Sequence, residues 1–420
     1  MSNSSKPWPR PASRYLRIGG FRVKDYDSHL DGFRFSATSA GIKRADLERL
    51  DFGLIAADAP AAAAAVTTTN VVVAAPVILT RERLQKGLCR AILVNSGNAN
   101  ACTGEQGIRD AIALTAEVSS ELKEDPNLVV PLSTGVIGVP LPLERMKKRI
   151  PSLIQGLETG SAKDVAQAML TTDTHLKMVS LKAQTSLGWI RLLGMAKGSG
   201  MIAPQMATML AVLLIDARVE PTFLREALHS AVEKSFNSIT VDGDMSTNDT
   251  VVALAGGSPQ AQTLESRDRA AFSDLLTEAC MDLARQIIRD GEGATKAVEI
   301  RVQGAQDTAS ALRIARKIAE SSLVKTAIHG EDPNWGRIVS SAGAAGIAFD
   351  PNVLDLFIGE VQIVTSGTLA SNDWEPAARE VMKRREYVIT LDLKAGQAQG
   401  AMLTTDLSEE YVKINADYRS

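Results

Sequence analysis

Five short segments combine glycine with serine, threonine, asparagine or aspartate, and none has the periodicity of a helix or a strand. Backbone-donor sites and tight turns need such residues, whereas a hydrophobic core does not. We therefore take these segments as the candidate sites of chemistry. They are Ser96-Gly-Asn-Ala-Asn-Ala-Cys-Thr-Gly104, Ser133-Thr-Gly-Val-Ile-Gly138, Lys197-Gly-Ser-Gly-Met-Ile-Ala-Pro-Gln-Met-Ala-Thr208, Asp242-Gly-Asp-Met-Ser-Thr-Asn-Asp249 and Asp290-Gly-Glu-Gly-Ala-Thr-Lys296.

Two of these segments have the residue types of ligand loops but not the context. A phosphate loop follows a strand and opens a helix, whereas Gly291–Lys296 follows a helical pattern and precedes a strand pattern. Gly291 is better explained as the glycine just past a helix end. Residues 242–249 carry alternate acidic residues as calcium loops do, but glycine is second rather than sixth and the distal glutamate is missing. A polar turn between two strands is the better interpretation.

Thr208 stands between a glycine-rich loop with a single lysine and the most apolar run of the chain, 209–215. A threonine hydroxyl becomes a useful nucleophile only when a base lies beside it. The simpler interpretation is a threonine that begins a strand, because threonine suits strands. Spacing alone favours this simpler interpretation.

The histidines and cysteines limit the chemistry further. No two histidines have a helical metal-ligand spacing. The odd number of cysteines and the lack of a Cys-x-x-Cys pair argue against a disulfide framework or zinc site and for a reducing compartment. We interpret each cysteine as a small buried hydrophobe. The residues are His29, His175, His229, His329, Cys89, Cys102 and Cys280.

Composition indicates a folded enzyme-sized chain rather than a nucleic-acid or membrane protein. The 420 residues suggest two or three structural units. Charge is nearly balanced, 46 − 49 = −3, which gives no basic excess for nucleic acid. The alanine-rich stretch 53–75 is interrupted by Asp58, Pro60 and Asn70, so it cannot span a membrane. We expect a soluble, cytoplasmic protein with a flexible N-terminal tail over residues 1–18.

Alternating short apolar runs and amphipathic patterns predict the elements that position the five segments. Mixed elements of this kind are typical of a layered α/β or α+β fold. The almost unbroken apolar run 209–215 predicts a central strand that is buried on both faces. Strands are predicted over 91–95, 128–132, 189–195, 209–215, 239–241, 250–254, 298–302 and 387–393, and helices over 108–122, 161–169, 223–232, 272–288 and 307–319.

The segments together resemble the ornithine acetyltransferase family, the bifunctional glutamate N-acetyltransferases of arginine biosynthesis. The resemblance covers the chain from about Gly53 to Ser420, and its motifs are long and in the expected order. Besides four of the segments above, it includes Thr171-Thr-Asp-Thr174, Asp332-Pro-Asn-Trp-Gly-Arg337 and Ile414-Asn-Ala-Asp-Tyr-Arg-Ser420.

The resemblance implies that the precursor cuts itself between Ala207 and Thr208. It gives an α chain segment over 19–207 after the tail, a β chain segment over 208–420, and a heterotetramer of α and β chains. The implied fold is an N-terminal-nucleophile-like layered α/β fold. Cleavage exposes the α-amine of Thr208, whose reference pKa of roughly 7.7–8.0 suits a general base. Nucleophile and base then belong to one residue.

The implied reaction moves an acetyl group from N2-acetyl-L-ornithine to L-glutamate through acetyl-Thr208, in ping-pong order. No cofactor is implied, and the use of acetyl-CoA as a co-substrate stays open. By resemblance, the oxyanion hole is formed by Thr134 and Gly135. The substrate-binding residues are Thr171, Lys197, Thr208, Glu292, Asn415 and Ser420, and the adjacent Thr172 can replace Thr171 because neighbours on a strand face opposite sides.

Two departures from the family pattern leave alternatives open. Residues 401–408 read Ala-Met-Leu-Thr-Thr-Asp-Leu-Ser where many arginine-pathway members have Trp-Gly-Cys-Asp-Leu, and His329 stands where an apolar residue is more usual. A clavulanic-acid-cluster type of ornithine acetyltransferase is therefore one alternative. An N-terminal-nucleophile amidase or aminopeptidase, in which water takes the acyl group, is another. An uncleaved binding homologue is a third, but the intact Ala207-Thr208 junction argues against it.

Overall fold

The chain forms two compact units in a computed structural model that describes residues 29–43, 49–203, 209–371 and 373–417. The large unit comprises Gly20–Asn237 and Asp244–Asp290, and the small unit comprises Ser238–Gly243 and Gly291–Tyr418. The division predicted at Ala207–Thr208 falls inside the large unit, so the predicted chain segments and the compact units divide the protein differently.

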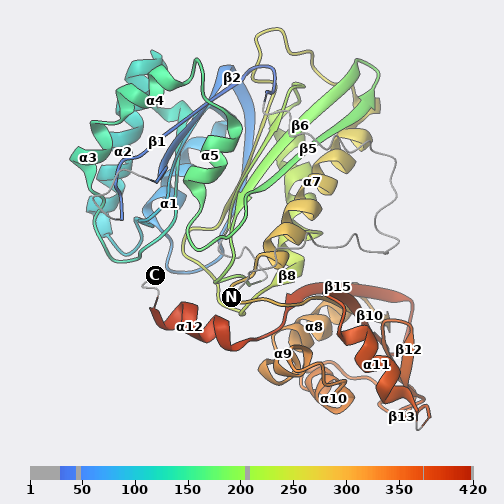
Figure 1. Ribbon diagram of the computed structural model, residues 1–420. Coiled ribbons are helices and arrows are strands. Elements are labelled where there is room, and N and C mark those ends of the chain that lie inside the picture. Colours follow the sequence, from blue (N-terminus) through green and yellow to red (C-terminus); the bar gives the residue numbers. More distant parts are fainter. Residues whose placement is uncertain (1–28, 44–48, 204–208, 372, 418–420) are drawn as a thin grey trace. The chain divides into compact units, whose positions relative to one another are not determined.

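An eight-stranded sheet organises the large unit, with the order β4-β3-β2-β9-β7-β6-β5 and β1 paired to β2 (Figure 1). Strand β7 lies between β9 and β6, and all six of its residues are buried, as the apolar run predicted. The strands are β1 (Phe33–Thr38), β2 (Phe52–Thr67), β3 (Leu88–Asn95), β4 (Val129–Ser133), β5 (Lys177–Thr185), β6 (Gly188–Lys197), β7 (Leu210–Ile215) and β9 (Thr250–Ala255).

Helices cover both faces of this sheet, because alternate residues of a strand point to opposite sides. On β3, Ile92 and Val94 join the core beneath α5, whereas Ala91 and Leu93 join the core beneath α2. Helices α6 and α7 pack against β2, β5 and β6. The helices are α1 (Ala75–Arg83), α2 (Gly104–Leu122), α3 (Leu143–Lys147), α4 (Ile150–Gly156), α5 (Ala162–Met169), α6 (Pro221–Glu233) and α7 (Arg269–Arg289).

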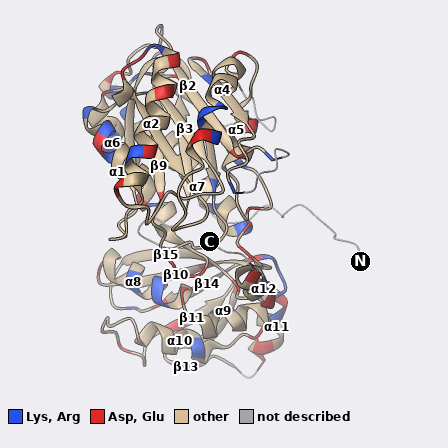
Figure 2. Cartoon of the chain, turned by 90° about the vertical axis from the view of Figure 1, so that its left-hand side faces the viewer, with Lys and Arg blue, Asp and Glu red and all other residues tan. Residues whose placement is uncertain are grey.

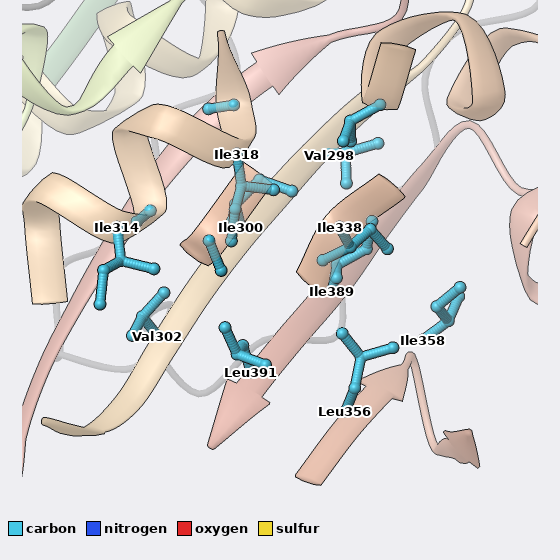
Figure 3. Packing of buried hydrophobic residues seen from close by; sticks show 14 of the residues in the cluster. Val298, Ile300, Val302, Ile314, Ile318, Ile338, Leu356, Ile358, Ile389 and Leu391 are labelled. Atoms are coloured by element: carbon cyan, nitrogen blue, oxygen red, sulfur yellow. The ribbon is translucent and has the colours of Figure 1, made fainter. Parts of the chain in front are cut away.

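The small unit is built on a seven-stranded sheet with the order β13-β12-β11-β14-β10-β15-β8. Figure 3 shows its core, in which Ile300 of β10 and Ile389 of β14 face Ile318 of α8 and Ile338 of α10. Fully burying an aliphatic side chain of this size contributes about 1.5–3 kcal/mol. The elements are β8 (Ile239–Thr240), β10 (Ala297–Ala305), α8 (Thr308–Ala319), α9 (Ser322–His329), α10 (Trp335–Gly343), β11 (Asp355–Ile358), β12 (Val361–Thr365), β13 (Thr368–Leu369), α11 (Trp374–Met382), β14 (Glu386–Asp392), β15 (Ala398–Thr405) and α12 (Glu409–Asp417).

The layered α/β class and the predicted strands and helices are confirmed, but the interpretation of the polar loop needs a correction. The polar loop 242–249 does not join two strands of one sheet, because β8 pairs with β15 in the small unit and β9 pairs in the large unit. The alanine-rich stretch forms most of β2, although alanine alone prefers helices. Pairing of β2 with β1, β3 and β9 overrides this preference.

Figure 2 shows Lys and Arg interspersed with Asp and Glu on the helices. Within the described ranges, no helix is both long enough and apolar enough to cross a membrane.

The cap of α5 gives a first test of the fold. Ser161 accepts a hydrogen bond from the Asp164 amide, and the Asp164 carboxylate accepts one from the Ser161 amide at 3.1 Å. Ser161→Ala removes one partner of a helix N-terminus, so we expect the free energy of unfolding to fall by about 1 kcal/mol. Urea denaturation followed by circular dichroism measures this change. Ser152→Ala on the exposed side of α4 is the matched control, and equal midpoints for the two variants would contradict the capping role.

Candidate functional site

The first two glycine-rich segments start side by side in the large unit, because β3 and β4 are adjacent parallel strands. Asn95 at the end of β3 pairs with Ser133 at the end of β4, and the Ser133 hydroxyl donates to Asn95 Oδ1 at 2.7 Å. Beyond the strands, Asn98 forms bridges with both Thr134 and Val136. The two segments therefore form one continuous structure at this edge of the sheet.

The fourth segment joins this structure through Asn248, which is buried. Its Nδ2 atom donates to the carbonyl oxygen of Ala99 at 2.6 Å and to that of Ser133 at 2.9 Å. A buried amide group must have its hydrogen bonds satisfied. Asn248 consequently fixes the backbone of both earlier segments from a position more than a hundred residues later in the chain.

Gly135 occupies a position that only glycine fits without strain. Its φ angle is +131°, and a Cβ atom there would lie 2.3 Å from the carbonyl carbon of Gly97 and 2.5 Å from the nitrogen of Asn98. Both clashing atoms belong to the backbone, so they cannot move aside as a flexible side chain can. The close approach keeps the 133–136 backbone against the 97–98 backbone.

Thr134 and Lys197 meet in the interior of the large unit. The Lys197 ammonium donates to Thr134 Oγ1 at 3.4 Å, and only 4% and 3% of these residues is exposed. The backbone amide of Thr134 already donates to the Asn95 carbonyl oxygen at 3.0 Å. The hydroxyl hydrogen is therefore the donor that Thr134 can direct toward a bound group.

Asp173 lies next to this pair and is held by a second lysine. Lys177 Nζ donates to Asp173 Oδ1 at 2.6 Å and to Asp290 Oδ2 at 2.5 Å. Burial opposes ionisation of Asp173, but the positive charges of Lys197 and Lys177 and the Gly198 amide outweigh it, so the pKa of Asp173 lies below its usual range. Asp173 is therefore a carboxylate at neutral pH.

The two candidate threonines at the end of α5 have different surroundings. The Thr172 hydroxyl forms a hydrogen bond with the Ser199 hydroxyl at 2.8 Å. The backbone amide of Thr171 donates to Asp173 Oδ2 at 3.1 Å, and Thr171 is half-buried. Thr172 thus contacts the loop after β6, while the role of Thr171 stays a prediction.

A buried acid, Asp249, contacts the residue that follows Thr208 in the chain. Its Oδ1 atom accepts a hydrogen bond from the Met209 amide at 2.9 Å, and its Oδ2 atom has no partner among the described residues. Burial raises the pKa of Asp249 well above its usual value, although the Met209 amide and the Lys197 charge offset part of the effect. Burial therefore favours the neutral form of the Asp249 carboxyl group over the charged form.

In the small unit, the structure brings together two of the predicted substrate residues. Asn415 on α12 donates from Nδ2 to Glu292 Oε2 at 2.9 Å. Gly293 has a φ angle of +67°, and a Cβ atom there would lie 2.4 Å from the Tyr411 amide nitrogen. Ser408 donates its hydroxyl to the Gly293 carbonyl oxygen at 2.6 Å. The turn that carries Glu292 is thus fixed against the start of α12.

His329, one of the two departures from the family pattern, contacts Asp406, which lies in the segment of the other departure. His329 Nδ1 lies 2.7 Å from Asp406 Oδ2, and the Asp406 side chain is inaccessible to solvent. Asp406 Oδ1 accepts hydrogen bonds from the amides of Thr295 and Lys296 at 2.8 and 2.9 Å. The unusual histidine therefore pairs with the carboxylate that holds the end of the Glu292 turn.

The remaining predicted residues are either outside the described ranges or are cysteines, whose burial can be compared with the prediction. Ala207, Thr208 and Ser420 lie outside the described residues. Cys89 and Cys280 are buried as predicted, and burial raises the pKa of the Cys89 thiol to about 12. The prediction for Cys102 is wrong: it is exposed and adopts a left-handed backbone with φ +55°. In the described part of the chain, no cluster of three or more His, Cys, Asp or Glu side chains could hold a metal ion.

The sequence analysis missed the residues that connect the segments to one another. Asp173 lies inside the Thr171–Thr174 motif and Asn248 and Asp249 end the fourth segment, so their positions were visible but their partners were not. Asp290 opens the fifth segment, so its position was visible too, whereas Lys177 gave no signal because it is the first residue of β5.

Comparisons with a family model and with individual proteins identify the same family. Residues 34–420 match the ArgJ family. The arginine biosynthesis bifunctional protein ArgJ of Geobacter sulfurreducens is 47% identical over 394 residues, which covers 93% of this chain and 100% of that protein. The protein of the same name from Syntrophotalea carbinolica is 47% identical over 393 residues and covers 93% of this chain and 99% of its own.

Solved structures with related sequences match about half of the chain each. The crystal structure of arginine biosynthesis bifunctional protein argJ from Bacillus halodurans is 40% identical, with a TM-score of 0.46, over 48% of this chain and 96% of that one. The crystal structure of ornithine acetyltransferase from Mycobacterium tuberculosis, complexed with ornithine, is 35% identical, with a TM-score of 0.39, over 42% of this chain and 93% of that one.

Proposed function

Because the chain belongs to the ArgJ family, we propose that it is a self-processing acetyltransferase that uses Thr208 to move an acetyl group from N2-acetyl-L-ornithine to L-glutamate. The family makes it a glutamate N-acetyltransferase of arginine biosynthesis. The route through acetyl-Thr208 is our proposal. The observation that supports it best is the buried Thr134–Lys197 pair, in which Lys197 ends β6 and opens the segment that leads to Thr208.

Processing begins when Thr208 Oγ attacks the Ala207 carbonyl carbon and the acyl group shifts from nitrogen to oxygen. Water then hydrolyses the resulting ester, which leaves a carboxylate on Ala207 and a free α-amine on Thr208. This amine can accept the hydroxyl proton of its own residue, because its reference pKa of roughly 7.7–8.0 lies near neutral pH. In this scheme no catalytic histidine is required, because the α-amine of Thr208 serves as the base.

In the first half of the reaction, Thr208 Oγ attacks the acetyl carbonyl carbon of N2-acetylornithine. The α-amine takes the hydroxyl proton and returns it to the departing ornithine nitrogen, so that acetyl-Thr208 and free ornithine result. In the second half, the amine of glutamate attacks the acetyl ester and regenerates the Thr208 hydroxyl. Each half passes through an oxyanion that accepts hydrogen bonds from the Thr134 hydroxyl and the Gly135 amide.

The charged residues suit an amino-acid substrate. We assign the substrate carboxylate to Lys197 and the substrate amine to Glu292, because each group then meets the opposite charge. Asn415 holds Glu292 at 2.9 Å, and Thr171 and Ser420 complete the proposed contacts. The engagement of Thr172 with Ser199 favours Thr171 over its neighbour.

Intact-mass analysis of the purified protein tests the proposal. We expect two chains of 207 and 213 residues, since 420 − 207 = 213, and the second chain should gain one acetyl group from N2-acetylornithine. Added glutamate should remove this acetyl group and form N-acetylglutamate. A single unmodified 44.8 kDa chain would contradict the proposal.

Further measurements on the processed protein distinguish the remaining alternatives for the acyl acceptor, the acetyl donor and the assembly. Loss of the acetyl group to water at the same rate with and without glutamate would indicate an amidase. Replacement of N2-acetylornithine by acetyl-CoA reports whether acetyl-CoA also serves as a donor. The native mass of the processed sample tests the proposed heterotetramer of two α and two β chains.

A further inference from the structure

Three buried charged residues form a network beside the Thr134–Lys197 pair. The side chains of Asp173, Lys177 and Asp290 are 0%, 1% and 5% exposed. Lys177 bridges the two carboxylates at 2.6 and 2.5 Å. Charges buried this deeply are tolerated only where partners and hydrogen bonds compensate for lost water, so the position of each group is tightly determined.

Asp173 also holds the chain beyond the end of β6. Its Oδ1 atom accepts a hydrogen bond from the Gly198 amide at 2.7 Å, directly after Lys197. The neighbouring Thr172 hydroxyl meets Ser199 at 2.8 Å. These contacts join residues 171–173 to residues 198–199. The positive charge of Lys197 is one of the causes that lower the pKa of Asp173, in keeping with the contact of Asp173 with Gly198, the residue that follows Lys197 in the chain.

The sheet does not need Asp173 to keep these strands together. β5 and β6 pair antiparallel over their whole length, and Lys177 pairs in register with Ala196. The β5–β6 ladder ends at Ala196, and the last pair of the β6–β7 ladder is Lys197 with Leu210. Asp173 therefore acts at Gly198, directly after regular pairing stops. Such a position suits a residue that orients a side chain, rather than one that stabilises the sheet.

We propose that Asp173 is a positioning residue for acetyl transfer, which holds Lys197 at Thr134 and is itself held by Lys177. This inference rests on the proposed function, which assigns the substrate carboxylate to Lys197. Asp173 does not contact the substrate in this scheme. It supplies the negative charge that keeps the buried Lys197 ammonium compensated before the substrate carboxylate arrives.

A double-mutant cycle with Asp173→Asn and Lys197→Met tests this inference on the processed enzyme. Asparagine has the same shape and can still accept from the Gly198 amide, but it lacks the charge. We expect Asp173→Asn to lower kcat/KM for glutamate by about 30-fold, chiefly through KM, a size typical of coupled neighbours. In the Lys197→Met background, the same change should have almost no further effect. All rates are normalised to the processed fraction measured by intact mass.

Additive losses in the double variant would overturn the inference, because they would mean that Asp173 acts independently of Lys197. If Asp173→Asn does not fold, Lys177→Arg replaces it in the same cycle and should show the same dependence on Lys197. Asp216→Asn is the matched control, since Asp216 pairs with Arg191 at 3.3 Å in the same sheet, and its kcat/KM should stay unchanged. A wild-type enzyme without acetyl transfer would contradict the proposed function itself, and thus is a distinct outcome.

Discussion

Replacing Thr208 with alanine is expected to leave one chain of 420 residues and to abolish acetyl transfer. The variant lacks the hydroxyl that attacks the Ala207 carbonyl, so neither the cut nor the α-amine forms. Loss of the nucleophile in an acyl-transfer enzyme lowers kcat by about 10⁶-fold. Intact-mass analysis reports the processing, and an assay of N-acetylglutamate formation reports the transfer.

Two control variants test whether the loss of activity is specific to the Thr208 hydroxyl. Thr208→Ser keeps a hydroxyl and should retain measurable processing and transfer. Thr368→Ala removes a hydroxyl from an exposed strand of the small unit and should change neither. Retained transfer in Thr208→Ala would place the nucleophile elsewhere in the chain.

Replacing Thr134 with valine is expected to lower kcat by about 10²–10³-fold with little change in KM. Valine has nearly the shape of threonine but cannot donate a hydrogen bond. The backbone amide of Thr134 cannot substitute for the hydroxyl, because it is bound to the Asn95 carbonyl oxygen at 3.0 Å. The loss should therefore fall on the oxyanion rather than on substrate binding. Steady-state kinetics of both half-reactions measures it.

Thr115→Val controls for loss of a buried hydroxyl in general. Thr115 is fully buried in α2, and its hydroxyl donates to the Ala111 carbonyl oxygen at 2.9 Å. This variant should keep its kcat and change only the free energy of unfolding. A Thr134→Val enzyme with unchanged kcat would remove the Thr134 hydroxyl from the proposed oxyanion hole.

The sequence predicted regular elements well because their signals are local. The unbroken apolar run at 209–215 specifies a strand buried on both faces, and Ser161 and Asp307 each cap the helix that the pattern indicated. The division into two sheets was not predictable in this way. β8 belongs to the small unit because it pairs with β15, about 160 residues later, and no local pattern reports such a partner.

For the candidate site, the sequence likewise predicted the local features but not the contacts between distant segments. Glycine, threonine and asparagine at strand ends marked where the segments of the site lie. The contacts between segments, such as Glu292 with Asn415 or Lys177 with Asp290, depend on how the chain folds back. Cys102 was misjudged for a related reason: its neighbours Ala99 and Ala101 are buried in a small core, but Cys102 itself is exposed.

The central place of β7 has a consequence for the enzyme after the proposed cut. Its neighbour β6 lies before Thr208 in the chain, and its neighbour β9 lies after it. The large sheet would therefore contain strands from both the α and the β chain. Hydrogen bonds on both sides of β7 hold this strand, which begins at Leu210, two residues after Thr208. The uncut chain can form this sheet by itself, but the two separated products must first meet. The proposed processing would therefore make refolding depend on the concentration of the two chains, whereas folding of the uncut chain is unimolecular.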